Sequence, residues 1–207
     1  MTSKKNYVCI IQLLNFKQIT LTSGRDLLNI RVDNILTQVK RITQQLPGLL
    51  VEVLGDKIRF TLDDNNQLER FIELIMDYTK QSLLFGLPHK AIIFEESPIT
   101  AKENNLNLYV SKEYFLAIEK LEKLDLAATI IDSNLYTENS NCFSKYVVNY
   151  DNEIVLKLAK RPIADIALQG MKNSIKNSFN KIGINEFDIE TSRILNNTLK
   201  FVDVQNS

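Results

Sequence analysis

The segment from residue 49 to residue 62 constrains the fold of this chain most, because it predicts a tight β-hairpin. Apolar and polar residues alternate along both arms, and Gly55 with Asp56 supplies a two-residue turn between them. One face of each arm is therefore apolar, and the other is available for chemistry. The Asp56 carboxylate projects at the tip, where it can serve as a metal ligand. Alternatively, its side chain only bonds backbone amides within the turn.

The periodicity on either side of this hairpin predicts a β-α-β-β-α-β order of elements. Residues 7–14 form a nearly continuous apolar run that Gln12 interrupts, as expected of a central strand. Apolar positions at helical spacing follow over residues 28–46 and again over residues 68–83. A fourth strand is predicted at residues 89–96. This order is that of the ferredoxin-like fold, in which helices cover an antiparallel sheet.

The second half of the chain is predicted to add further elements to this core and to end in a separate helical segment. A polar loop over residues 101–107 precedes a helix at 111–124, a strand at 127–131 and a terminal hairpin within 146–158. Arg161 and Pro162 mark a boundary, which divides the chain into a domain of residues 1–160 and a helical appendage of residues 161–207. The appendage is expected to pack on the sheet or on a second subunit.

Composition excludes several classes of function. Lysine plus arginine and aspartate plus glutamate both number 25, so no net charge attracts the chain to nucleic acid or to an anionic membrane. No apolar run reaches the length of a membrane span, and Cys9 and Cys142 are too few and too far apart for a disulfide framework or a zinc site. We expect a cytoplasmic protein with no nucleic-acid or membrane partner.

Four short motifs, in the right order, resemble one known family. Residues 13–16 (Leu-Leu-Asn-Phe) stand where that family has Asp-Ile-x-Gly-Phe, and residues 52–56 (Glu-Val-Leu-Gly-Asp) resemble Glu-Thr-Ile-Gly-Asp. Residues 89–92 (His-Lys-Ala-Ile) resemble Arg-Gly-Ala-Ile, and residues 117–122 resemble the core of the helix before the fifth strand. Residues 7–158 thus resemble a divergent bacterial class III adenylate or guanylate cyclase homology domain. The resemblance implies an α+β fold, a ferredoxin-like βαββαβ core with an additional strand and helix.

The resemblance also implies a two-metal mechanism, in which Mg²⁺ or Mn²⁺ ions assist attack of a ribose 3′-hydroxyl on the α-phosphate. Two carboxylates normally hold the ions, one in the hairpin turn and one at the end of the first strand. Here the turn position is Asp56, whereas the strand position is Gln12, a degenerate ligand that carries no negative charge. Gln12 could equally be a polar residue that hydrogen-bonds a neighbour inside a buried strand.

The nucleotide-binding positions that the resemblance implies are Glu52 for the base, Arg59 and Lys57 for phosphate, and Asn15 with Phe16 at the start of the connection to the first helix. The alternative, which the usual exposure of charged residues favours, is that Glu52, Arg59 and Lys57 are ordinary solvated charges on a strand. The Asn-x-x-x-Arg motif of typical cyclases has no match in the helix at 111–124, so the catalytic residues stay unknown.

Three functions follow from these patterns. The first is a cyclase-like protein of bacterial signalling or anti-phage defence, catalytically impaired and acting by nucleotide or partner binding. The second is an active cyclase that converts a nucleoside triphosphate to a 3′,5′-cyclic nucleotide with Mg²⁺ or Mn²⁺. The third is an unrelated ferredoxin-like interaction module. For the first two, the expected partners are a nucleoside triphosphate and a second subunit, in a homodimer or in a heterodimer with another cyclase-like chain.

Overall fold

A computed structural model describes residues 5–103, 106–182 and 189–206 of the chain. Its elements, in order, are β1 (Asn6–Leu13), α1 (Phe16–Thr22), α2 (Arg25–Gln45), β2 (Leu50–Leu54), β3 (Lys57–Leu62), a 3₁₀ turn (Asn65–Gln67), α3 (Leu68–Phe85), β4 (His89–Glu96), β5 (Ile99–Glu103), β6 (Leu106–Val110), α4 (Lys112–Lys123), β7 (Thr129–Ile131), α5 (Ser133–Glu138), α6 (Ser140–Phe143), β8 (Val147–Tyr150), β9 (Glu153–Leu156), α7 (Asp165–Lys181) and α8 (Ile189–Asp203).

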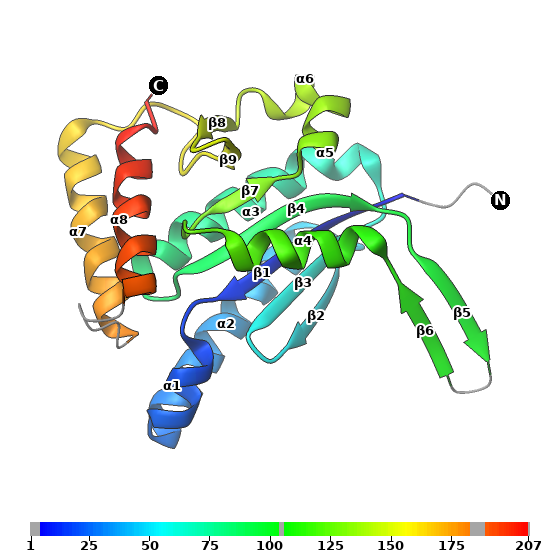
Figure 1. Ribbon diagram of the computed structural model, residues 1–207, viewed down its shortest axis with the longest axis horizontal. Coiled ribbons are helices and arrows are strands. Elements are labelled where there is room, and N and C mark those ends of the chain that lie inside the picture. The colour runs from blue at the N-terminus through cyan, green and yellow to red at the C-terminus, as the bar shows by residue number, and fades with distance from the viewer. Residues whose placement is uncertain (1–4, 104–105, 183–188, 207) are drawn as a thin grey trace.

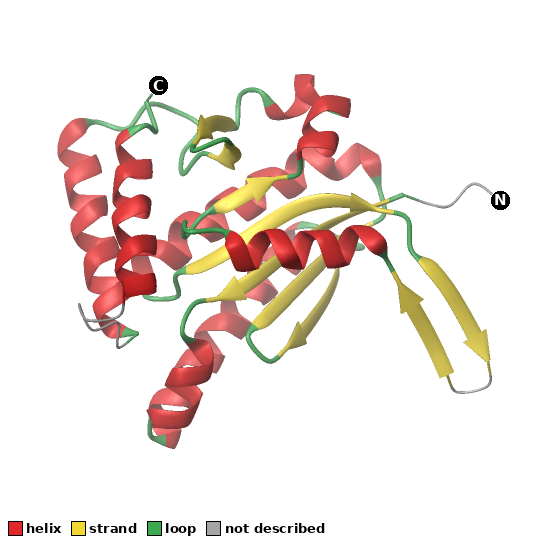
Figure 2. Cartoon of the chain, viewed as in Figure 1, coloured by secondary structure: helices red, strands yellow, loops and turns green. Residues whose placement is uncertain are grey.

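The main sheet has seven strands in the order β2-β3-β1-β4-β7-β9-β8 (Figure 1). Its first four strands are antiparallel, with β1 between β3 and β4, which confirms the ferredoxin-like core predicted from the sequence. The additional helix and strand are α4 and β7, and β7 joins β4 in parallel. The fold class is therefore α+β, with helices on both faces of the sheet (Figure 2).

The hairpin that the sequence predicts is formed by β2 and β3. Glu52 pairs with Arg59 and Leu54 with Lys57, which leaves Gly55 and Asp56 as the two-residue turn. Gly55 has a φ of 61°, a left-handed value that glycine adopts without steric cost. This turn brings Asp56 to the end of β1, where the candidate site lies.

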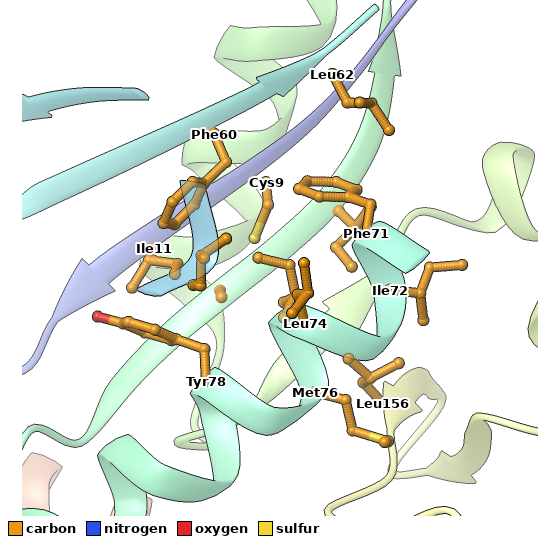
Figure 3. Packing of buried hydrophobic residues seen from close by; sticks show 14 of the residues in the cluster. Cys9, Ile11, Phe60, Leu62, Phe71, Ile72, Leu74, Met76, Tyr78 and Leu156 are labelled. Carbon is orange, nitrogen blue, oxygen red and sulfur yellow. The ribbon is translucent and has the colours of Figure 1, made fainter. Parts of the chain in front are cut away.

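The first face of the sheet, which carries the odd-numbered side chains of β1, packs against α2 and α3. Along β1, this packing involves hydrophobic side chains only. Cys9 and Ile11 are fully buried there, as is Phe60 on β3, and Phe71 of α3 lies against them (Figure 3). Such a face of a strand is stabilised by the area it removes from water, at about 25 cal/mol per Å². This core fixes β1 and β3 relative to each other and so fixes the hairpin turn.

The second face is covered by α4, α7 and α8. Val8 and Ile10 of β1 share one hydrophobic cluster with Leu121 of α4, Phe179 of α7 and other apolar residues of α7 and α8. The C-terminal helices therefore pack on the sheet of their own chain, one of the two arrangements expected for them. The domain boundary after residue 160 stays a prediction. None of the helices in the described part of the chain has the length and apolar character that a bilayer span requires.

Two expectations for local structure were wrong. The segment before residue 24 was expected to be an irregular connection, but it contains α1. Ile19 of this helix is buried in the second-face cluster, which stabilises the helix. Asn15, directly before the helix, has a left-handed conformation with a φ of 55°. The polar loop expected over residues 101–107 lies mostly in the antiparallel ribbon of β5 and β6, with residues 104–105 outside the described part. Apolar and polar residues alternate from Leu106 to Val110, a period that favours a strand.

Candidate functional site

The structure brings the two predicted metal positions, Gln12 and Asp56, into contact. The Leu13 amide donates a hydrogen bond of 2.9 Å to the Asp56 carbonyl, which ties the end of β1 to the hairpin turn. The Gln12 Nε2 atom then donates to Asp56 Oδ2 at 3.2 Å. The Asp56 side chain is 35% exposed, so it remains accessible to a ligand.

These residues form part of a cleft of about 510 Å³ at the end of β1. The volume lies within the range of about 300 to 1,000 Å³ that is common for small-molecule sites. Its walls come from five elements and a turn that are far apart in the sequence. The polar residues that line it include Gln12, Asn15, Asp56, Lys90, Glu122 and Thr191.

Lys90 is one of the cleft residues that were not predicted from the sequence, as are Glu122 and Thr191. It lies on β4 directly opposite Gln12 of β1, and only 5% of its surface is exposed. A buried lysine directly before an apolar run, here residues 91–94, is unusual because lysine is rarely buried. Its position before the apolar run was the only indication in the sequence that Lys90 is unusual. The register of the sheet was needed to place Lys90 beside Gln12.

The polar residues of the cleft do not fit a two-metal centre. Hard divalent cations require several oxygen ligands and negative charge, but Gln12 is neutral and directs its amide nitrogen, rather than its oxygen, at Asp56. Lys90 adds a positive charge on the neighbouring strand. Within the described residues, no group of three or more histidine, cysteine, aspartate and glutamate side chains is arranged to hold a metal ion.

Three predicted nucleotide-binding residues lie in a second, smaller hollow on the same face of the sheet. Glu52, Lys57 and Arg59 line this hollow of about 180 Å³ together with Tyr114 and Phe115 of α4. The predicted residues are thus divided between two places. Lys57 comes nearest to connecting them, because its Nζ atom lies 4.0 Å from Asp56 Oδ1.

Arg59 is held by contacts within the protein. Its guanidinium forms an ion pair with Glu96 of β4, whose side chain is fully buried, and lies 3.6 Å from Glu52 Oε2. The same group lies over the Tyr114 ring, 5.8 Å from its centroid. Arg59 therefore links three strands and α4. Glu52, in contrast, is mostly exposed, as expected of a charge on an edge strand.

Asn15 and Phe16 also make contacts within the protein. The Asn15 Nδ2 atom donates a 2.8 Å hydrogen bond to the Ile182 carbonyl, which ties the start of α1 to the end of α7. Phe16 is half-buried against the first-face core. Both residues line the cleft, but Asn15 uses one of its two amide protons for this structural contact.

His89, the only histidine, is a core residue. Its ring lies 5.3 Å from the Tyr78 ring, centroid to centroid, on the first face of the sheet. Burial lowers the pKa of its imidazole from 6.5 to about 4, and a weak contact with the Leu87 carbonyl opposes this only in part. The side chain is therefore neutral at physiological pH, and it does not line the cleft.

Comparisons by sequence and by structure give different neighbours. No family model matches the chain. RNA polymerase α subunits of Helicobacter pylori and Helicobacter acinonychis are 27% identical to it over 158 residues. That match covers 73% of this chain, but the chain spans only 38% of the length of these curated relatives.

Solved structures resemble the chain over most of their own length. The guanylyl cyclase domain of the Blastocladiella emersonii RhoGC protein matches with a TM-score of 0.56 and 11% identity, covering 74% of this chain and 94% of that one. The GTP-bound domain from Catenaria anguillulae gives 0.55 and 10%, with the same coverages. A bacterial light-regulated adenylyl cyclase gives 0.51 and 10%, covering 84% and 97%. Together with the strand order described above, these matches show that the chain has the fold of class III adenylyl and guanylyl cyclase catalytic domains.

Proposed function

We propose that this chain is a cyclase-like domain that binds a nucleoside triphosphate and a partner subunit without efficient turnover, and that it acts in signalling. The observation that carries the proposal is the contact between Gln12 and Asp56. One carboxylate and one carboxamide occupy the positions at which the resemblance implies two metal-binding carboxylates. The cleft around them keeps the size of a ligand site.

The expected loss of catalysis follows from electrostatics. Cyclisation builds negative charge on the attacking and leaving oxygens, and removing one preorganised partner of such charge costs about 10²- to 10³-fold in rate. Gln12 cannot supply the charge of a carboxylate, and α4 offers lysines in place of the Asn-x-x-x-Arg motif. Two of these lysines are engaged elsewhere, since Lys120 pairs with Glu153 at 2.7 Å and Lys123 with Glu119 at 2.6 Å.

A turnover assay tests this proposal. Each of the four labelled nucleoside triphosphates is incubated with Mg²⁺ or Mn²⁺ and the parent protein, Gln12→Asp, Asp56→Ala or the control Asp77→Ala, which changes an exposed carboxylate of α3. We expect no cyclic product from the parent, and product from Gln12→Asp if the rest of the site is competent. A cyclic product from the parent and from Asp77→Ala that disappears in Asp56→Ala would establish an active cyclase instead.

Partner binding is supported by apolar side chains that the chain leaves exposed beside the second hollow. Leu54 of β2 is 71% exposed and Phe115 of α4 is 65% exposed, and both line this hollow. Exposed apolar groups that gather at one place commonly mark an interface. We expect a dimer, with a second copy or with another cyclase-like chain. Phe115→Asp should then lower the mass measured by light scattering from dimer to monomer, whereas Phe85→Asp, another exposed position, should not.

The likeness to RNA polymerase α subunits favours a second candidate, an assembly module. It is the weaker candidate because the match covers a minority of those proteins and the chain has no net positive charge. Specific co-purification of polymerase subunits with the tagged chain would favour it. A role in bacterial anti-phage defence rests on the family resemblance alone, and a plaque assay with and without the gene tests that role.

A further inference from the structure

The main sheet ends at β2, and no strand in the described part of the chain pairs with the outer edge of β2 (Figure 1). We propose that this edge pairs with β2 of a second copy of the chain. The two strands are antiparallel and related by a two-fold axis, with Val51 opposite the partner's Val51. This inference rests on the proposed function, because it specifies how the dimer expected there is joined.

β2 has few of the features that protect an edge strand from association. Four of its five residues are apolar, and Leu50, Val53 and Leu54 are 66%, 48% and 71% exposed. Several charges, a proline or a bulge commonly protect such an edge, but β2 has a single charge, Glu52, and pairs with β3 in an unbroken register. At the opposite edge, the apolar residues of β8 are partly buried against the two cores. β2 is therefore the edge that can accept another strand.

The hydrogen bonding of the hairpin shows which backbone groups of β2 point outward. The Asp56 carbonyl accepts a hydrogen bond from the Leu13 amide of β1, so every second residue of β3, beginning with Lys57, directs its polar backbone groups at β2 instead. The β2 partners of these residues are Leu50, Glu52 and Leu54. By the same alternation, the N–H and C=O groups of Val51 and Val53 point away from β3. An added strand would pair with these groups.

The charge and the turn of the hairpin select one register for the two copies. With Glu52 on the two-fold axis, two carboxylates would lie directly opposite each other, which is destabilising. With Val53 on the axis, Val51 would lie opposite the partner's Gly55, which belongs to the turn and not to a strand. With Val51 on the axis, Glu52 lies opposite the partner's Leu50, and the two Val51 residues exchange a pair of hydrogen bonds.

The side chains beside β2 favour a second copy as the added strand. Leu54 lines the second hollow together with Phe115, the surface that the proposed function assigns to a dimer. A two-fold dimer uses the same patch on both copies and covers both β2 edges at once. Specific dimers bury about 800 Å² per subunit, which is more than a five-residue strand supplies. The two second hollows lie on the same face of the joined sheet, and their exposed apolar walls add to the buried area.

Light scattering over a range of protein concentrations tests the proposal. Val51→Pro removes an outward N–H group from each copy and leaves the hydrogen bonds to β3 in place. The dissociation constant of the dimer should therefore rise by about 10- to 100-fold, as expected for two lost hydrogen bonds. The matched control Val51→Thr keeps the N–H group and the branched shape, and it should change the constant by no more than a few-fold. A dimer that Val51→Pro does not weaken would overturn the inference.

Cysteine cross-linking keeps the test decisive if Val51→Pro does not fold. Cys9 is buried, so Cys142→Ser removes the native cysteine that is accessible. In this background, Val51→Cys should give a disulfide-linked dimer on mild oxidation, because residues paired across antiparallel strands have Cα atoms about 5.5 Å apart. Val53→Cys is the control, since the two copies of this residue lie four positions out of register. Equal or stronger linkage through Val53→Cys would overturn the inference.

The remaining outcomes separate the inference from the proposed function. A dimer that Phe115→Asp dissociates, but that is neither weakened by Val51→Pro nor linked through Val51→Cys, would overturn the inference and leave the proposed function standing. A parent protein that stays monomeric at every concentration and forms no linked dimer through Val51→Cys would overturn both the inference and the dimer of the proposed function.

Discussion

The two faces of β1 are packed against different surroundings. On the first face, the odd-numbered side chains from Tyr7 to Leu13 are all buried against α2, α3 and neighbouring apolar residues. On the second face, Val8 and Ile10 enter a core, but Gln12 reaches the cleft and Arg59 crosses from β3 to Glu96. The first face therefore serves stability alone, whereas the second combines packing with charges that a ligand can reach.

A large-to-small substitution on the first face should give the largest loss of stability. Phe60 is fully buried opposite Cys9, so Phe60→Ala should lower the free energy of unfolding by about 3 to 5 kcal/mol, measured by urea denaturation. Leu54→Ala on the exposed side of β2 should change it by less than about 0.5 kcal/mol. Similar values for both variants would mean that the two faces do not differ in this way.

Acid should destabilise the protein through His89, the only histidine of the chain, which is buried on the apolar first face. The pKa is about 4 in the folded state and 6.5 in the unfolded chain, so below pH 6.5 only the unfolded state takes up the proton. Above pH 6.5 the imidazole contributes nothing, and between pH 6.5 and pH 4 the free energy of unfolding should fall by about 3 kcal/mol from this group.

Urea midpoints of the parent and of His89→Gln, measured from pH 7.5 to pH 4.5, isolate this effect from carboxylate titration. The variant should lose less stability across the range. An identical pH dependence in both proteins would show that His89 is accessible to protons in the folded state.

Breaking the ion pair on the second face should have a smaller effect. Glu96→Gln leaves Arg59 without its buried partner and should cost about 2 kcal/mol, less than for a fully buried pair because Arg59 is partly exposed and also near Glu52. The double variant Arg59→Met, Glu96→Leu should recover most of this loss, because no charge remains buried. If the double variant does not recover this stability, the loss in Glu96→Gln comes from packing and not from the buried charge.

Sequence patterns predict the framework of this fold because they are local. Alternation and a Gly-Asp turn predict the hairpin, and the helical period predicts α2, α3 and α7. The pairing of Gln12 with Asp56 was also within reach, since both positions are marked by the family resemblance and the structure brings them together.

The rest of the site depends on contacts between distant segments. Nothing near Arg59 in the sequence indicates Glu96, because the two meet only after β1 is placed between β3 and β4. Lys90 becomes a cleft residue only through its register with Gln12. The short ribbon of β5 and β6 was missed because its polar residues are as frequent as those of a loop, and pairing decides between the two.

The position of α8 has a consequence for how the cleft comes into existence. Thr191 and Ile194 of α8 form one wall of the cleft, whereas the floor of the cleft belongs to β1, the hairpin turn and β4. Synthesis proceeds from the N-terminus, so the floor is available to fold long before this wall emerges from the ribosome. The moment at which a newly made chain first acquires the nucleotide affinity proposed above should therefore report the docking of α8, and not the assembly of the sheet.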